Sequence, residues 1–233
     1  MRPTLFPIHR PRVGISVSAS ALSLVALRRP WFRRPIVKQV VERSLPSGLL
    51  KVSATEPHIT DLDAFVQELR ALTEGLSERT VALSVPNRAM HMGVFAFDRF
   101  PDAPEERAGL IKWRFREDLN LTIGDARVML RVFPTGTRTQ VLAVAVRQTI
   151  LDQYEDVCGR AGLIPVSMGF SHLQLIGLYR RLMKGTRRLC VMHWTGDEFM
   201  LLLFDQGQPV FLRTKSMTGG TQDLRRELVG TLQ

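Results

Sequence analysis

The chain has 233 residues and a formal net charge of +10, and hydrophobic residues make up 45% of it. At roughly 150 residues per domain, this length predicts one large domain or two small ones, and the composition excludes intrinsic disorder. Two cysteines, Cys158 and Cys190, are too few for a disulfide framework or a cysteine zinc site, so we expect a reducing compartment. No apolar run reaches about 18 residues, so the sequence predicts no membrane-spanning helix.

The positive charge is concentrated near the amino terminus. Residues 1–43 hold nine lysines and arginines against one acidic residue, Glu42. Such a lobe suits anionic lipid, nucleic acid or an acidic partner, and it suits a solubilising surface equally well. A secretory signal is not expected, because serines interrupt the apolar stretch Val13–Leu27 and basic residues follow it directly. Residues 1–12 are predicted to form a basic disordered arm.

The predicted elements follow the order βββαββαββαβαβββα. Strands are predicted from alternating or β-branched apolar residues, and helices from apolar residues spaced three and four apart. The strands are expected at 13–17, 22–27, 36–41, 80–85, 89–97, 126–133, 140–146, 163–168, 188–194, 198–205 and 209–216. The helices are expected at 61–74, 104–119, 148–161, 171–183 and 221–232. Thr60 or Asp61 is expected to cap the first helix and Gly75 to end it, and Gly207 is expected to turn the last pair of strands. The sequence thus predicts a mixed α/β fold in which a triple-stranded hairpin occurs near both ends.

The residues that most often carry catalysis give no convincing centre. Gly169–Leu173 imitates the turn that exposes a nucleophilic serine, but Leu173 replaces its second glycine, and Ser171 is more simply a helix N-cap. The five histidines show no i,i+4 pair and no adjacent acidic ligand pattern. Cys158 and Cys190 lie in apolar stretches and are expected in the core. The sequence therefore predicts neither a hydrolytic centre nor a metal site.

The tip of the first triple hairpin combines basic and aromatic residues. Its residues are Arg28, Arg29, Trp31, Phe32, Arg33 and Arg34. This combination can stack bases and bind phosphate, or it can press aromatic rings into an anionic membrane interface. Because no DNA- or RNA-reading motif accompanies it, an anionic membrane or an acidic partner surface is the expected contact. The alternative is an exposed tip whose apolar residues are covered by a neighbouring element.

Several stretches match one family in consistent order over about 13–230. They are Val13–Leu27, Thr80–Pro86, Glu105–Trp113, Leu142–Arg147 with Ala161–Val166, and Gly207–Arg213 with Gly219 and Gly220. Together they resemble PilM, the actin-like protein of type IV pilus assembly. The resemblance implies an α/β, actin-like (ribonuclease-H-like) core with an inserted small α/β subdomain and an incomplete second lobe. It assigns 13–78 plus 163–192 to the core, 79–162 to the insertion and 193–233 to the start of the second lobe.

The resemblance breaks at the residues that handle nucleotide in this family. The differing positions here are Ser16, Ser18, Ser23, His193 and Thr195, whereas Gly219 and Gly220 of the same expected site match the family. Ser16, His193 and Gly169 stand where the family has aspartates, and further family glycines and a lysine are also replaced. Carboxylates hold the metal in such sites, and glycines let backbone amides approach phosphate. The resemblance therefore implies a vestigial nucleotide site, a pseudo-ATPase with neither ATP nor Mg²⁺ as cofactor.

The function implied by the resemblance is a non-catalytic cytoplasmic scaffold at the inner membrane. In this family a groove between core and insertion receives the cytoplasmic tail of the membrane protein PilN, and Trp113, Val81 and Leu83 are expected to line it here. Trp113 is expected either as the anchor of the bound tail or as a buried residue on the insertion sheet. Pilus assembly ATPases are further candidate partners. The alternatives are an ATP-binding pilus or type II secretion component similar to the L protein, and a basic nucleic-acid-binding module.

Overall fold

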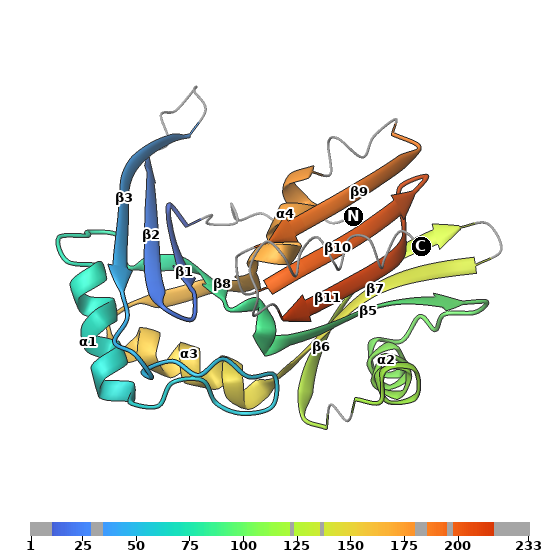
Figure 1. The fold of residues 1–233 in the computed structure, drawn as a ribbon, viewed down its shortest axis with the longest axis horizontal. Coiled ribbons are helices and arrows are strands. Elements are labelled where there is room, and N and C mark those ends of the chain that lie inside the picture. Colours follow the sequence, from blue (N-terminus) through green and yellow to red (C-terminus); the bar gives the residue numbers. More distant parts are fainter. Residues whose placement is uncertain are drawn as a thin grey trace. The chain divides into compact units, whose positions relative to one another are not determined.

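The chain divides into two compact units in the computed structural model (Figure 1), which describes residues 11–28, 35–121, 124–135, 138–179, 186–194 and 198–216. Unit 1 comprises residues 1–52, 57–86 and 152–170. Unit 2 comprises residues 53–56, 87–151 and 171–233. The predicted helix at 221–232 and nearly all of the predicted arm at 1–12 lie outside the described residues.

Unit 1 is built on a five-stranded sheet in the order β3-β2-β1-β4-β8. The strands are β1 (Val13–Val17), β2 (Ala21–Arg28), β3 (Ile36–Ser44), β4 (Thr80–Val85) and β8 (Ile164–Phe170). β1, β2 and β3 form an antiparallel meander, as the alternating pattern predicted, and β4 and β8 run parallel to β1. The side chains of Val13, Ile15 and Val17 all point to one face and are buried there.

Two helices, α1 (Leu62–Leu72) and α3 (Gln148–Arg160), cover that face of the sheet. Asp61 caps α1 by accepting a hydrogen bond from the Ala64 N–H at 2.9 Å, so one of the two predicted caps is confirmed. α1 ends at Leu72, before the predicted stop at Gly75, whose φ of 73° lies in the left-handed region. The ring of Phe65 meets that of Tyr154 edge to face at 6.4 Å between centroids.

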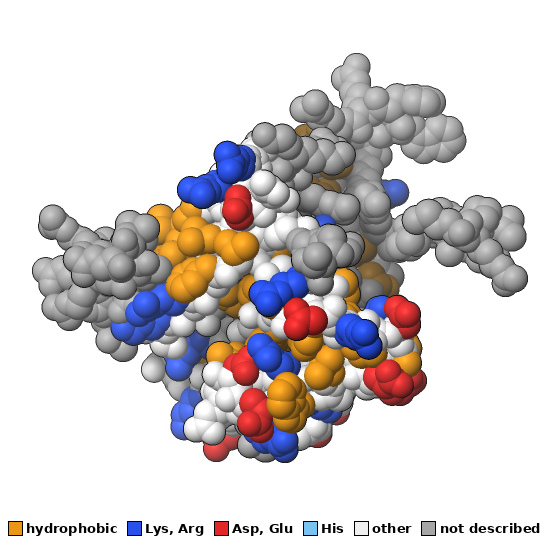
Figure 2. Space-filling model, turned by 90° about the vertical axis from the view of Figure 1, so that its right-hand side faces the viewer, with side chains coloured by type: hydrophobic (Ala, Val, Ile, Leu, Met, Phe, Trp, Pro, Cys, Tyr) orange, Lys and Arg blue, Asp and Glu red, His pale blue; other side chains and the backbone are white. Residues whose placement is uncertain are grey.

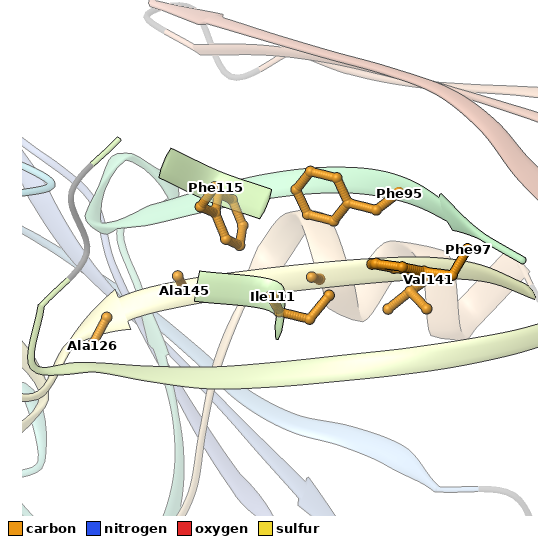
Figure 3. Close-up of a cluster of buried hydrophobic side chains, with 8 residues drawn as sticks. Phe95, Phe97, Ile111, Phe115, Ala126, Val141 and Ala145 are labelled. Carbon is orange, nitrogen blue, oxygen red and sulfur yellow. The ribbon is translucent and has the colours of Figure 1, made fainter. Parts of the chain in front are cut away.

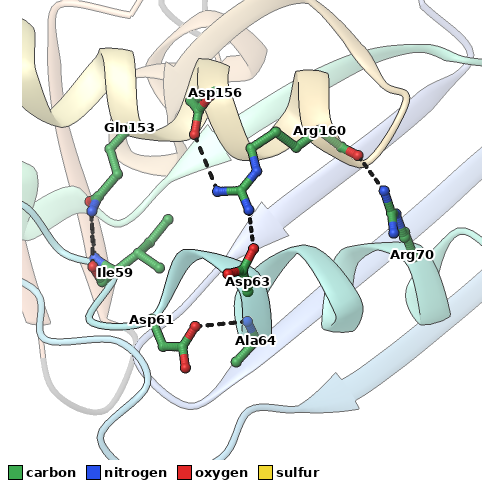
Figure 4. Close-up of polar contacts among 8 residues, drawn as sticks. All are labelled: Ile59, Asp61, Asp63, Ala64, Arg70, Gln153, Asp156 and Arg160. Atoms are coloured by element: carbon green, nitrogen blue, oxygen red, sulfur yellow. Dashed lines mark hydrogen bonds and ion pairs between the residues drawn. The ribbon is translucent and has the colours of Figure 1, made fainter.

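Polar contacts tie α3 to α1 and to the segment before α1 (Figure 4). The Arg160 guanidinium pairs with Asp63 and, at 3.6 Å, with Asp156. Arg70 donates to the Arg160 carbonyl oxygen at 2.7 Å. Gln153 accepts from the His58 and Ile59 N–H groups, at 2.8 and 2.9 Å, and donates to the Ile59 carbonyl. These contacts satisfy backbone groups of a loop that would otherwise have to remain in water.

Unit 2 contains a three-stranded antiparallel sheet covered by one helix. β5 (Met90–Phe97), β7 (Arg138–Arg147) and β6 (Ala126–Thr135) pair in that order, and α2 (Pro104–Leu119) lies across them. Ile111 and Phe115 of α2 are buried against strand residues in the cluster of Figure 3. Phe95 and Phe115 meet edge to face at 5.2 Å. The Phe95 ring lies over Gly93, where an added Cβ would come within 2.5 Å of it.

A second antiparallel meander follows in the same unit. After the short 3-10 turn η1 (Asn87–Ala89) and the first sheet come α4 (Ser171–Tyr179), β9 (Arg188–Trp194), β10 (Glu198–Asp205) and β11 (Gln208–Ser216). The sheet order is β11-β10-β9, and β11 also packs against β5 and β7. Gly207, with φ of 77°, turns β10 into β11 as predicted. The two predicted triple hairpins are thus confirmed as meanders of the same topology.

The structure corrects the predicted domain boundaries for two helices and two strands. Most of α3, residues 152–160, was assigned to the insertion but belongs to unit 1, and α4 was assigned to the core but belongs to unit 2. β4 was assigned to the insertion, but it lies between β1 and β8 and is therefore a central strand of unit 1. Residues 188–192 were assigned to the core, but they belong to β9 and pair with β10 in unit 2. These errors have the same cause: strand pairing and helix packing are set by contacts distant in sequence, whereas the boundaries were placed at breaks along the chain.

Candidate functional site

The turn between β1 and β2 belongs to the hairpin whose sequence resembles the first phosphate-binding hairpin of PilM-like proteins. Here the Ser18 hydroxyl closes the turn, accepting from the Ala21 N–H and donating to the Ala21 carbonyl, both at 3.0 Å. The Ser18 N–H also donates to the Ala21 carbonyl, at 2.9 Å. The Ser18 N–H, the Ser18 hydroxyl and the Ala21 N–H, which could donate to a phosphate, are therefore already hydrogen-bonded within the turn.

A row of small neutral residues crosses the sheet of unit 1 behind this turn. Ser16 lies directly opposite Ser23 on β2 and Ser84 on β4, and Ser84 lies opposite Gly169 on β8. We call these four residues the neutral row. They share the face of the sheet opposite α1 and α3, since they alternate with the buried residues of the helix-covered face. No residue from Val13 to Leu27 is ionisable, so the hairpin offers hydroxyls but no carboxylate to a magnesium–phosphate group.

The corresponding place in the second meander holds a pair of histidines. The rings of His193 on β9 and His172 on α4 meet edge to face with centroids 4.7 Å apart. His172 is only 3% exposed, and neither of its ring nitrogens has a hydrogen-bond partner. Burial, and then the neighbouring His193, lower the pKa of His172 to about 3, and burial lowers the pKa of His193. Both imidazoles are therefore neutral at pH 7. Thr195, Gly219 and Gly220 lie outside the described residues.

Buried polar groups next to this pair hold α4 in place. The Asn87 side chain exchanges hydrogen bonds with the Ser171 hydroxyl at 2.9 and 3.1 Å, and it accepts from the His172 N–H at 3.1 Å. Buried Glu198 accepts from the Arg88 N–H at 3.0 Å. Ser171 is thus bonded to an amide rather than to a histidine base, which leaves it without the partner a nucleophile needs. Neither Asn87 nor Glu198 was predicted as a site residue, and the only local signal is that the polar Asn87 directly follows Pro86 at the end of a strand.

The remaining reactive side chains are suited to structural roles. Burial raises the pKa of Cys158 to about 12, with Glu155 adding to the shift, and burial also raises the pKa of Cys190. The Tyr154 hydroxyl hydrogen-bonds His58 Nδ1 at 2.9 Å, and burial raises the pKa of Tyr154. Cys158 is buried as predicted, but Cys190 is exposed. Among the described residues, no three histidine, cysteine or acidic side chains are grouped so that they could hold a metal ion.

The three residues predicted to line a partner groove differ in exposure. Val81 and Leu83 are 0% and 1% exposed, and their strand β4 is paired on both edges, by β1 and β8. They therefore offer neither a side chain nor a strand edge to a peptide, and their assignment to the groove is corrected. Trp113, in contrast, is 46% exposed on α2. It is not buried on the insertion sheet, which removes one of the two interpretations of this residue.

The surface around Trp113 is mixed in charge. Figure 2 shows basic and acidic side chains interspersed with hydrophobic ones on the face that carries α2. Along the helix, Trp113 is four residues from Gly109, where an added Cβ would meet nothing within 4 Å, so the helix surface is open there. Exposed Arg116 and Glu117 lie on the following turn. A tryptophan in such a setting can act as an interface anchor.

Only one residue of the predicted basic tip lies within the described part of the chain. Arg28 is exposed at the end of β2, and Arg29, Trp31, Phe32, Arg33 and Arg34 lie outside the described residues. The expected contact with an anionic membrane or an acidic partner stays a prediction. No helix among the described residues is long and apolar enough to cross a membrane.

The five-stranded sheet followed by a second meander belongs to the actin-like fold. No model of a known protein family matches the sequence, and no curated protein matches it. Among solved structures, a chain of a PilM-PilN type IV pilus biogenesis complex is similar, with a TM-score of 0.71 and 22% identity over 93% of this chain. The fold is therefore that of PilM, as the resemblance implied. The chain spans 65% of the length of that neighbour.

Two further solved structures share the fold at lower similarity. One is a Bacteroides thetaiotaomicron protein with an actin-like ATPase fold and unknown function, with a TM-score of 0.56, 12% identity, and coverage of 94% of this chain and 74% of its own. The other is the cytoplasmic domain of EpsL, an inner-membrane component of the Vibrio cholerae type II secretion system. Its TM-score is 0.50 and its identity 10%, with 88% of this chain and 70% of that chain covered.

Proposed function

We propose that the chain is a non-catalytic, cytoplasmic scaffold of an inner-membrane type IV pilus assembly complex, and that it binds the cytoplasmic tail of a PilN-like membrane protein. The observation that carries this proposal is the neutral row in a PilM-like fold. Serines and a glycine stand on four adjacent strands of unit 1, and none of them offers a carboxylate of the kind through which proteins usually bind Mg²⁺. A fold that keeps its architecture without these charges retains the capacity to bind proteins.

The proposal makes the chain a pseudo-ATPase that holds neither ATP nor Mg²⁺. Calorimetric titration with Mg-ATP tests this part directly. A dissociation constant of 1 µM corresponds to about 8 kcal/mol of binding free energy, and a hairpin without carboxylate, lysine or free glycine amides should not supply it. Micromolar binding of Mg-ATP would refute the pseudo-ATPase proposal and favour the alternative, an ATP-binding pilus or type II secretion component.

The partner-binding part is tested on α2, where Trp113 is the proposed anchor. The probe is a fluorescent peptide with the cytoplasmic tail sequence of a PilN-like membrane protein. We expect Trp113→Ala to weaken its binding at least tenfold, because large aromatic anchors dominate such interfaces. Leu119→Ala is the matched control, since Leu119 is a similarly exposed apolar residue of the same helix (44% against 46%).

The outcomes of this titration separate the candidate functions. Equal loss of binding in the two variants, or none in either, would rule out Trp113 as the anchor. A parent protein that does not bind the peptide but binds nucleic acid, with an affinity that falls steeply as the salt concentration rises, would favour a basic nucleic-acid-binding module. Circular dichroism shows whether both variants keep the fold. We expect that they do, because both side chains are exposed.

A further inference from the structure

The middle of α2 contains a glycine that the packing of the helix does not require. Gly109 is exposed, and an added Cβ would meet nothing within 4 Å, so no neighbouring group needs the space that the absent side chain leaves. Glycine inside a helix is destabilising relative to alanine, because it loses more conformational freedom on folding. A local cost without a compensating contact inside the molecule is typical of functional sites.

Gly109 and Trp113 lie together on the outer surface of α2. Ile111 and Phe115 are both 0% exposed and hold the opposite side of the helix on its sheet (Figure 3). Residues four apart in a helix are neighbours on one face, about 5–6 Å apart between Cβ positions. Because nothing lies within 4 Å of a Cβ added at Gly109, the Trp113 ring leaves the surface over this glycine open. We call these two residues and the open surface between them the Gly109–Trp113 site.

The charged side chains of α2 leave a negative charge beside this site. Its four basic residues are each bonded within unit 2: Arg107 to Asp102 at 3.3 Å, Lys112 to the Gly124 carbonyl at 2.9 Å, Arg114 to Asp118 at 2.6 Å and Arg116 to Glu117 at 3.2 Å. Glu105 and Glu106 lie one turn before Gly109 and are exposed, and neither forms an ion pair with another described residue. The charge left to a ligand here is therefore acidic, in a chain whose net charge is +10.

We propose that the Gly109–Trp113 site determines which partner tail is bound, by seating one apolar side chain of the tail over Gly109 and against the Trp113 ring, with a basic residue of the tail beside Glu105 and Glu106. This inference rests on the proposed function. A glycine lets a bound chain approach the helix closely, and a large aromatic ring supplies the apolar contact. Cytoplasmic segments near a membrane span carry an excess of lysine and arginine, so a tail of this kind complements the two glutamates.

Substitution of Gly109 should move stability and binding in opposite directions, which a merely structural role would not do. Gly109→Leu should raise the urea midpoint of unfolding, because leucine favours the helix, and it should weaken binding of the fluorescent tail peptide about tenfold, because its side chain fills the seat. Gly159→Leu is the matched control: Gly159 is an exposed glycine of α3, and an added Cβ there also meets nothing within 4 Å. This control should bind the peptide as the parent does.

The charge of the occupant is tested with a second peptide in which glutamine replaces each lysine and arginine of the tail. We expect this peptide to bind the parent about threefold more weakly than the first, as for an exposed ion pair. A protein with both Glu105→Gln and Glu106→Gln should bind the two peptides equally, and an equal loss in this variant and the parent would contradict the basic occupant.

The failures of this proposal and of the proposed function are distinguishable. If Gly109→Leu binds the tail peptide as tightly as the parent, whereas Trp113→Ala does not, the seat over Gly109 is overturned and the partner function stands. A parent that does not bind the peptide overturns both. A lower urea midpoint in Gly109→Leu would show that the glycine is required for packing, and the inference would then lose its basis.

Discussion

His172 makes a quantitative prediction about stability and pH. Its side chain is 3% exposed, and burial lowers its pKa from an ordinary value of about 6.5 to about 3. In the unfolded chain the same imidazole takes up a proton near pH 6.5. As the pH falls from about 6.5 toward 3, the unfolded state therefore binds one proton more than the folded state, and stability is lost over that window. Above about pH 7 the residue is neutral in both states and contributes no pH dependence.

The size of the effect follows from the two pKa values. Each pH unit between them costs about 1.36 kcal/mol, so lowering the pH from 7 to 4.5 should remove about 2.5 kcal/mol through His172 alone. Replacing the residue by leucine, which is similar in volume and cannot titrate, should remove this part of the pH dependence. Because both ring nitrogens of His172 lack partners, His172→Leu should cost little at pH 7.

Urea unfolding at pH 7.0 and 4.5 measures the difference between parent and variant. Two of the three tryptophans, Trp113 and Trp194, belong to unit 2, so fluorescence follows the unit that contains His172. His91→Gln is the control, since His91 is half-buried and its pKa is lowered by burial and then by Arg147. We expect this control to keep most of the parent's acid sensitivity. If parent and His172→Leu lose the same free energy within about 0.5 kcal/mol, His172 is not a neutral buried imidazole and the explanation fails.

Two further predictions concern the core of unit 2 and the basic tip. Phe115→Ala should lower the free energy of unfolding by about 3–5 kcal/mol, because it leaves a cavity beside Phe95. Trp113→Ala should lower it by less than about 1 kcal/mol, because Trp113 is half-exposed, and urea unfolding measures both changes. Replacing Arg28, Arg29, Arg33 and Arg34 by glutamine should weaken binding to anionic vesicles about 1,000-fold, at about 1 kcal/mol for each arginine. Lysine at the same four positions should retain most of the vesicle binding, and a parent that does not sediment with anionic vesicles would reduce the tip to a solubilising surface.

The sequence predicted the elements of this fold better than their grouping. Local patterns located β1, β2 and β3 and the helix α2, because alternation and helical spacing are properties of a short window. The place of β4 could not be predicted in this way. The segment Thr80–Val85 ends before Pro86 and has the composition of a strand, but nothing in it says which strands flank it.

The candidate site shows the same division between local and distant information. Ser16 and Ser23 could be identified along the chain, and a hairpin necessarily places them close together. The contact between His172 and His193 could not be predicted, since 20 residues and no common motif separate them. Burial of Asn87 and Glu198 likewise depends on which elements pack together. Trp113 was left open between two interpretations because an aromatic residue off a helix stripe is compatible with either, and only its exposure decides.

The two meanders each have a residue without negative charge at the same position of their first strand. Ser16 is the next-to-last residue of β1, and His193 is the next-to-last residue of β9; each strand is the first of its meander. Both positions correspond to aspartates in the family that the chain resembles. At pH 7 neither residue carries a negative charge: one is a hydroxyl, and the other is an imidazole whose burial keeps it neutral. A divalent cation prefers carboxylate oxygens, so restoring one position would still leave the other without its charge. The proposal of a non-catalytic scaffold is therefore supported by both meanders, each of which has a residue without negative charge at this position.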